Sequence, residues 1–218
     1  MTNSKEMILK RIQTALHKEP GREPQRAGVE RKYQTHGKLK QEERIRLFIE
    51  RVSDYKARIT GVEERELPKV IAKICAAEQV KILVVPPGID ERWLPVKSSG
   101  VALLSDESEP LAIHELDQSD AVLTGCFRAV AQTGTIVMNG GAGQGRRLLT
   151  LLPDFHICVV RTDQVVGIVP EVFWELDPFI REKRVPVTFI SGPSATSDIE
   201  LDRVEGVHGP RRLHVLIV

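Results

Sequence analysis

Val80-Lys81-Ile82-Leu83-Val84-Val85 is a short, nearly continuous apolar run that Pro86-Pro87-Gly88 ends directly. Runs of this kind are typical of strands that are buried on both faces, as in parallel sheets. The residues before it, Leu67 to Gln79, carry apolar side chains at helical spacing along one face. Together the two segments predict a helix that packs on a buried strand.

The same alternation continues along the chain. Further apolar runs predict strands at 101–104, 121–124, 156–160, 185–190 and 213–218. Short helices or helical turns are expected between them, at 90–96, 127–132 and 146–152. Such alternation is typical of an α/β fold in which helices cover a mostly parallel sheet.

The N-terminal part has a different character. Ile8, Ile12 and Leu16 predict a first helix, from about Ser4 to His17, and a second helix is expected from Gln41 to Ile59. Residues 18–40 between them contain proline, glycine and many charges, which indicates a linker or an extended arm. We therefore divide the chain into a basic helical arm with its linker, residues 1–60, and an α/β domain, residues 61–218.

The formal net charge is +1, but residues 1–60 carry +7 and the remainder −6. A nucleic-acid partner for this arm is disfavoured, because acidic residues are interleaved and Tyr33 is the one aromatic residue of the linker. A solvated arm or one that contacts another subunit fits better. No run approaches the roughly 20 apolar residues that cross a membrane. The N-terminus also lacks a signal-peptide core, so we expect a cytoplasmic protein.

The three cysteines, Cys75, Cys126 and Cys158, are far apart and form no C-x-x-C pair. Iron–sulfur clusters need clustered thiolates, and a disulfide framework needs recognisable spacing. Cys75 and Cys158 lie in apolar surroundings, where a free cysteine behaves as a core residue. We therefore expect no cofactor within this chain, and the spacing of its histidines and carboxylates indicates no metal site.

Two glycine-containing segments are candidate ligand contacts. Thr133-Gly134-Thr135 offers hydroxyls and close backbone approach beside a strand end, where open α/β sheets bind ligands. Asn139 to Arg147 reads N-G-G-A-G-Q-G-R-R, which is neither a dinucleotide fingerprint nor a Walker A loop. This bend could be an anion cradle, or a plain hairpin or mobile lid. In a cradle, the ligand contacts would come from Asn139, Gly140, Gly141 and Arg146.

Ser191 to Pro210 is a 20-residue polar segment between two expected strands. Loops of this length are usually functional or disordered, although a structural turn followed by a helix cap would also fit. Its candidate ligand-facing residues are Ser191, Gly192, Ser194 and Thr196, and its candidate acid–base residues are Asp198, Glu200 and His208. We expect this segment, the threonine-glycine turn and the glycine-rich bend to meet at one rim of the sheet.

Three motifs follow one another along the chain: A-x-T-G-T from Ala131, L-L-P-x-x-H-I from Leu151, and G-P-S-x-T-x-D-I-E followed by G-V-H-G-P from Gly192. In this order they resemble the LUD-domain family, the lactate-utilisation protein C group. The sequence departs from the family pattern at Ala195, commonly arginine, and at Gln132, commonly glutamate. The family is similar in fold to the NagB/RpiA/CoA-transferase superfamily. The resemblance therefore implies a three-layer α/β/α domain with a mostly parallel sheet, preceded here by the helical arm.

The resemblance also implies a component of bacterial L-lactate utilisation, which oxidises L-lactate to pyruvate together with iron–sulfur partner proteins. In this hypothesis Arg146 or a cluster of backbone N–H groups holds the substrate carboxylate. His208 would accept the proton, and Asp198 or Glu200 would orient it. Two alternatives stay open: a transferase or isomerase of small phosphorylated or acyl substrates, and a non-catalytic ligand-binding or assembly subunit. The sequence leaves open whether this chain is an enzyme by itself.

Overall fold

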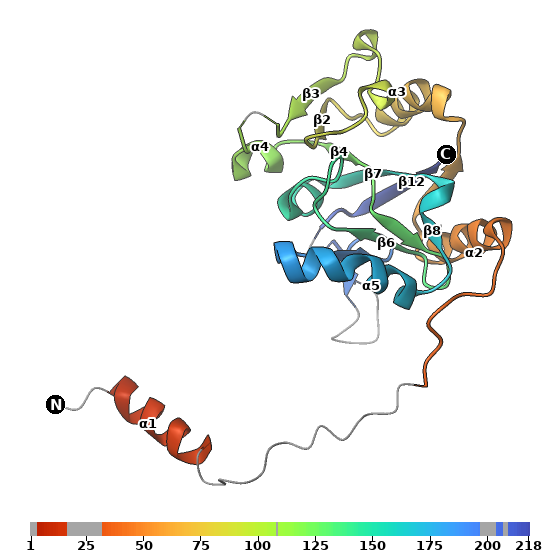
Figure 1. Cartoon of the computed structure of the whole chain (residues 1–218). Coiled ribbons are helices and arrows are strands. Elements are labelled where there is room, and N and C mark those ends of the chain that lie inside the picture. The colour runs from red at the N-terminus through yellow and green to blue at the C-terminus, as the bar shows by residue number, and fades with distance from the viewer. Residues whose placement is uncertain (1–3, 17–31, 108, 197–203, 207–208) are drawn as a thin grey trace. The chain divides into compact units, whose positions relative to one another are not determined.

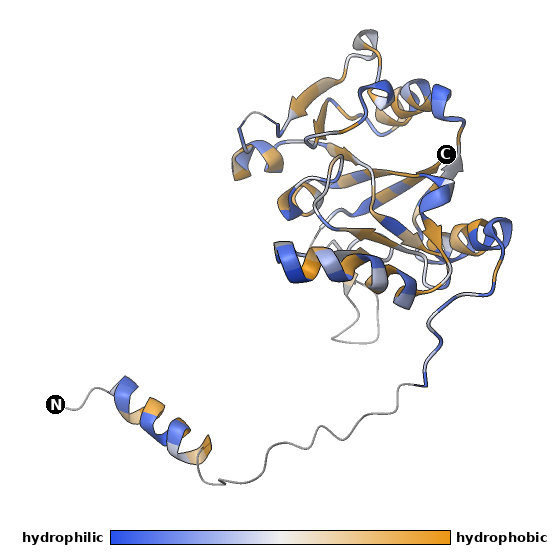
Figure 2. Cartoon of the chain, in the orientation of Figure 1, coloured by the Kyte–Doolittle hydropathy of each residue, from blue (hydrophilic) through white to orange (hydrophobic). Residues whose placement is uncertain are grey.

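The computed structural model describes residues 4–16, 32–107, 109–196, 204–206 and 209–218. The chain divides into two compact units, Met1–Tyr33 and Gln34–Val218. In the first unit, helix α1 (Ser4–Leu16) leaves every one of its side chains exposed, and polar and apolar residues follow one another along it (Figure 2). The second unit contains the other described helices and strands (Figure 1).

The second unit begins well before the boundary that the sequence placed at residue 60. Helix α2 (Gln41–Asp54) buries Phe48 and Val52 in the core of this unit. The segment before the helix is attached as well, because the backbone N–H of Gly37 donates to Glu171 Oε1 at 2.9 Å. Helix α2 ends earlier than predicted, and strand β1 (Arg58–Gly61) follows because it pairs with a strand of the main sheet.

A six-stranded sheet forms the centre of this unit, and every neighbouring pair of its strands is parallel. The order is β1, β12 (Arg212–Ile217), β7 (Phe155–Val160), β4 (Ala121–Thr124), β2 (Ile82–Val85) and β3 (Ala102–Ser105). The α/β fold with a mostly parallel sheet is therefore confirmed. The apolar run at 80–85 forms β2, in the interior of the sheet, as its composition predicted.

Helices cover both faces of this sheet. Leu83 and Val85 of β2 pack on the side of helix α3 (Leu67–Ala77), whereas Val84 between them packs with Leu116 of helix α4 (Ile113–Asp117). This alternation follows from the two-residue period of a strand. Helix α2 lies on the same face of the sheet as α4, so that the arrangement is α/β/α.

A second, four-stranded sheet was not predicted. Its order is β8 (Val165–Val166), β5 (Arg128–Val130), β6 (Thr135–Met138) and β9 (Thr188–Ile190), and helix α5 (Val169–Pro178) packs on it. The expected helical turn at 127–132 is wrong, because Ala129 and Val130 are buried in β5, which pairs antiparallel with β6. Gly134 makes the turn between these two strands with a φ of +59°.

The remaining elements are short. They comprise the 3-10 helices η1 (Glu64–Glu66), η2 (Glu91–Trp93), η3 (Lys97–Ser99), η4 (Arg147–Thr150) and η5 (Thr162–Gln164), the π-helix η6 (Phe179–Lys183), and the hairpin strands β10 (Ala195–Thr196) and β11 (Val204–Glu205). The expected helices at 90–96 and 146–152 are thus single 3-10 turns. None of the described helices combines the length and the apolar character that crossing a bilayer requires.

Candidate functional site

A pocket of about 430 Å³ lies between the main sheet and the small sheet. Pro87 and Asp106 reach it from the carboxyl ends of β2 and β3, and Met138 and Thr188 reach it from paired positions of β6 and β9. The glycine-rich bend that follows β6 forms another wall. Ligands in open α/β sheets bind at the carboxyl ends of parallel strands, and pockets of about 300–1,000 Å³ are typical of small-molecule sites.

The glycine-rich bend is fixed in place by backbone contacts. Gly143 N–H donates to Pro87 O at 2.8 Å, and Gly143 O accepts from Gly125 N–H at 2.7 Å. Gly145 has a φ of +70°, and a Cβ there would lie 2.4 Å from Leu149 and 2.8 Å from Pro86. The glycines therefore permit both the left-handed backbone and the close packing of the bend on the end of β2.

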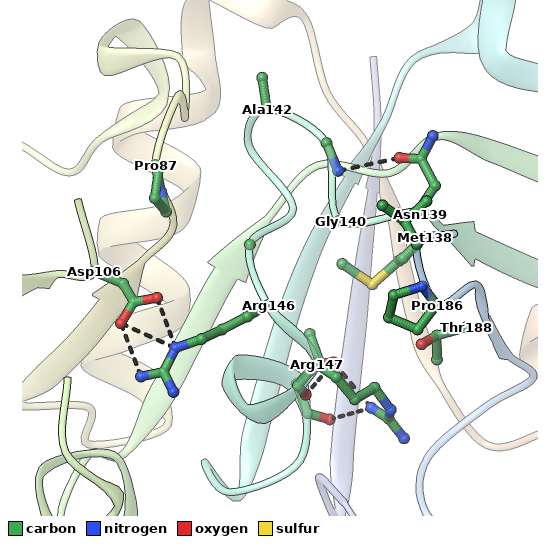
Figure 3. A pocket seen from close by; sticks show the side chains of 14 residues that line it. Pro87, Asp106, Met138, Asn139, Gly140, Ala142, Arg146, Arg147, Pro186 and Thr188 are labelled. Atoms are coloured by element: carbon green, nitrogen blue, oxygen red, sulfur yellow. Dashed lines mark hydrogen bonds and ion pairs between the residues drawn. The ribbon is translucent and has the colours of Figure 1, made fainter. Parts of the chain in front are cut away.

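Arg146 points away from the centre of the pocket, toward Asp106 (Figure 3). Its Nε and Nη2 donate to the Asp106 carboxylate at 3.0 Å each, and Nη2 also donates to Leu111 O. Asp106 is buried and accepts a further bond from Leu111 N–H at 2.8 Å. The hydrogen bonds that Arg146 donates to the Asp106 carboxylate raise the pKa of the guanidinium. The predicted anion-binding arginine thus forms an ion pair within the wall of the pocket.

Arg147 also lines the pocket, but its side chain points in a different direction from that of Arg146, toward the bottom of the view (Figure 3). Its Nη1 donates to Thr150 Oγ1 at 3.0 Å, and that hydroxyl also lies 3.3 Å from Arg147 O. Burial lowers the pKa of this guanidinium, but arginine stays charged in proteins. Within the described parts of the chain, Arg147 makes no ion pair.

Asn139, another predicted contact, organises the bend from inside. Its backbone N–H donates to Gln144 Oε1 at 2.8 Å, and its side-chain oxygen accepts from Gly141 N–H at 3.1 Å. Gly140, with a φ of +69°, lies between them and also lines the pocket. The structure therefore brings the predicted residues Asn139, Gly140, Gly141 and Arg146 together in the wall of one pocket.

The threonine-glycine turn lies at the opposite end of β6 from this pocket. Thr135 starts the strand, whereas Met138 and the bend are at its other end. The Thr135 hydroxyl lies 2.7 Å from those of Thr133 and Ser191, and a Cβ at Gly134 would collide with Arg51 of helix α2. The expectation that this turn meets the glycine-rich bend at one rim is therefore not met.

Ser191 and Gly192 belong to the same end as the turn. A Cβ at Gly192 would lie 2.4 Å from Tyr55 Cβ, just after helix α2. The chain then returns, because Ser194 N–H donates to Pro210 O at 2.8 Å, and Gly209 has Thr150 O and Ser194 as its neighbours. Ser194 is thus brought beside the pocket through Gly209 and Thr150.

The predicted acid–base residues Asp198, Glu200 and His208 lie outside the described residues. Thr196 is described only as part of β10. The binding and catalytic roles assigned to the residues of segment 191–210 stay predictions.

A cluster of buried polar side chains lies between the two sheets. Thr124 Oγ1 is 2.7 Å from His156 Nε2, and both side chains are buried. A hydrogen bond from Cys126, opposed by burial and assisted by His156 and Thr124, lowers the pKa of Cys158. These residues have internal partners and belong to the interior rather than to the described pocket.

The cysteines do not match the ligand set of an iron–sulfur cluster. Such clusters take four cysteine ligands, or two with two histidines in Rieske centres. Cys75 packs in the core on the α3 side of the sheet, and Cys126 and Cys158 pack on the opposite side. With three cysteines divided between two cores, the residues of this chain do not fit a cluster.

Sequence reasoning missed the part that Arg147 and Asp106 play. Arg147 stands beside the predicted contact Arg146 in the same glycine-rich bend, and Asp106 stands in the acidic stretch 106–109, which has the composition of a solvated loop. The signal that separates the two arginines is the ion pair of Arg146 with Asp106, across 40 residues of sequence.

Comparisons with known proteins agree with this architecture. Lactate utilization protein C of Deinococcus radiodurans is 50% identical over 186 residues, which cover 85% of this chain and 84% of that protein. The protein of the same name from Halalkalibacterium halodurans is 35% identical over 109 residues, 49% of this chain and 47% of that protein. Uncharacterized protein YkgG of Escherichia coli is 27% identical over 194 residues, 83% of this chain and 81% of that protein.

A solved structure is also similar. The crystal structure of a DUF162 family protein from Deinococcus radiodurans superposes with a TM-score of 0.70 at 44% sequence identity, over 83% of this chain and 99% of that chain. The model of the LUD domain matches residues 45–218, which include most of helix α2 and both sheets. This chain therefore belongs to the LUD domain family.

Proposed function

We propose that this protein is a component of L-lactate utilisation and takes part in the oxidation of L-lactate to pyruvate. The observation that carries the proposal is the 50% identity, over 85% of this chain, to a protein named lactate utilization protein C. Six further relatives of that name, from six other bacteria, are 29–37% identical over shorter stretches.

The pocket supports a small organic acid as the ligand. Its polar lining includes two arginine side chains, of which one is neutralised by Asp106. Its lining also includes Met138, Val185 and Pro186, which present apolar surface. A few placed polar groups within apolar walls are typical of small-molecule sites.

Oxidation of lactate to pyruvate releases two electrons and two protons, and the electrons need an acceptor. The residues of this chain do not fit an iron–sulfur cluster, as described above. We therefore assign the acceptor clusters to separate iron–sulfur partner proteins. The proposal retains His208 as the proton acceptor, oriented by Asp198 or Glu200. It also retains a cytoplasmic location.

The test is reconstitution of lactate-dependent dye reduction from this chain and its co-purifying proteins. Activity should require this chain together with iron–sulfur proteins, and omission of either should abolish it. Turnover of sugar phosphates or acyl-CoA by the isolated chain would contradict the proposal. A stable complex whose lactate oxidation is unchanged when this chain is removed would also contradict it.

A further inference from the structure

We propose that Arg147, and not Arg146, is the residue that binds the ligand's carboxylate, and that the pocket selects monocarboxylic acids with an apolar substituent. The proposal deepens the proposed function, on which it rests for the assignment of lactate and pyruvate as members of this class. Its first basis is the different surroundings of the two adjacent arginines.

Arg146 has little capacity left for a ligand. Both Nε and Nη2 are bound to the Asp106 carboxylate, and Nη2 also binds Leu111 O. The Asp106 side chain is 5% exposed, so the pair is held within the protein and its charges cancel locally. Breaking such a pair to bind a ligand would leave a buried carboxylate uncompensated.

Arg147 has the opposite arrangement. One of its nitrogens, Nη1, is held by Thr150, which orients the guanidinium, and its Nε and Nη2 make no hydrogen bond within the described parts of the chain. The side chain lines the same pocket as Pro186 and Thr188. A guanidinium with two free parallel donors matches the two oxygens of a carboxylate.

The charge of the pocket limits the class of anion. Arg146 and Asp106 cancel, so Arg147 supplies one net positive charge among the described lining residues. A single positive charge balances a monoanion, whereas a phosphate dianion would keep excess negative charge in a partly desolvated site.

The apolar lining of the pocket favours a ligand that carries an apolar substituent beside its carboxylate. Met138, Val185 and Pro186 line the same pocket as Arg147. The cavity of about 430 Å³ has the volume of sites that hold ligands larger than a three-carbon acid. Each added methylene that becomes buried is therefore expected to raise affinity about fourfold, from about 0.8 kcal/mol per group.

The test is titration calorimetry on the full-length chain without partner proteins, so that it does not depend on lactate oxidation. The probes are pyruvate, 2-oxobutyrate, 2-oxovalerate, L-lactate and inorganic phosphate. Wild type should bind the oxo acids with affinity rising along the series, and phosphate more weakly than pyruvate. Arg147→Gln should weaken 2-oxovalerate binding at least about tenfold, the cost of losing hydrogen bonds to a charged group.

Two further variants make the result specific. Arg147→Lys keeps the positive charge but loses the two parallel N–H donors of the guanidinium. Its affinity for 2-oxovalerate should therefore lie between those of wild type and Arg147→Gln. Arg65→Gln removes an arginine that is 79% exposed and should bind like wild type. Equal affinity of wild type and Arg147→Gln, no saturable binding by wild type, or tighter binding of phosphate than of pyruvate would overturn the proposal. If the wild-type chain binds the oxo acids as expected but the reconstituted system does not oxidise lactate, the result would contradict the proposed function and leave the role of Arg147 in binding supported.

Discussion

Asp106 and Arg146 form an ion pair that joins the end of β3 to the glycine-rich bend, with the carboxylate almost fully buried and the guanidinium about one-third exposed. The two residues belong to segments that are separated by three strands in the chain order. The pair therefore holds together two walls of the pocket, and its loss should affect the stability of the fold before it affects any chemistry.

Asp106→Asn should lower the free energy of unfolding by about 2–3 kcal/mol, because Arg146 loses its counter-charge. The cost stays moderate since the guanidinium can still reach solvent. Urea denaturation followed by circular dichroism measures it. Glu63→Gln is the matched control, because its pair with Arg65 is exposed on both sides and should contribute less than about 1 kcal/mol. Equal losses of unfolding free energy in both variants would show that burial of the Asp106–Arg146 pair does not increase its contribution to stability.

Gly145→Ala and Gly100→Ala separate backbone strain from collision. Both glycines have left-handed backbone, with φ of +70° and +73°. A Cβ at Gly100 has open space, so only the strain of about 1–2 kcal/mol is expected there. A Cβ at Gly145 would collide with Leu149 and Pro86, which should add about 1–3 kcal/mol and weaken oxo-acid binding. Thermal unfolding and titration of both variants check this, and equal behaviour would refute the packing argument.

Thr135→Val tests which end of β6 binds the ligand. The variant removes hydroxyl contacts with Thr133 and Ser191, so stability should fall by about 1–2 kcal/mol. Binding of 2-oxovalerate should stay within twofold of wild type, because Met138 and the pocket are at the other end of the strand. A loss of affinity as large as that of Arg147→Gln would indicate that the threonine-glycine turn belongs to the binding site.

His214 predicts a pH dependence of stability. Burial, with Arg58 nearby, lowers the pKa of His214, whose Nε2 lies 2.9 Å from Thr60 Oγ1. The unfolded chain, with the ordinary histidine pKa of about 6.5, therefore takes up the proton first as the pH falls. Stability from this group is present above about pH 6.5 and is lost as the pH drops below it.

His214→Gln should remove this component of the pH dependence between about pH 7 and pH 5, measured by denaturation at each pH. The range lies above the titration of Glu78, whose pKa is lowered because hydrogen bonds from Arg212 and Arg58 outweigh the effect of burial. The control is His114→Gln, which changes an exposed histidine and should leave the profile unchanged. An unaltered profile in His214→Gln would contradict the assignment.

The main sheet could be predicted because its signals are local. Val80 to Val85 is apolar throughout since both faces of β2 are covered, and helix α3 shows its buried face at regular spacing. In the small sheet, β9 falls within the apolar run predicted at 185–190, whereas β5 and β8, of three and two residues, are too short for a periodic signal. At 58–61 the strand is set by its pairing with β12, which no local pattern contains.

The pocket could be predicted only in part. The glycine-rich bend was found because glycines with left-handed backbone are visible in the sequence. Arg146 and Arg147 are chemically identical neighbours, and only the ion pair with Asp106 distinguishes them. The turn at Thr133–Thr135 and the bend flank the same strand, but β6 separates Thr135 from Asn139 by about 13 Å, at about 3.3 Å per residue.

The position of β12 between β1 and β7 has a consequence for biosynthesis. Arg58 pairs with His214, about 150 residues further along the polypeptide. While the ribosome is still making the intervening segments, β1 and β7 each lack the neighbour that will saturate their backbone amides and carbonyls. The nascent chain therefore carries two unpaired strand edges until β12 has been made, and this is the stage at which it is most prone to aggregation.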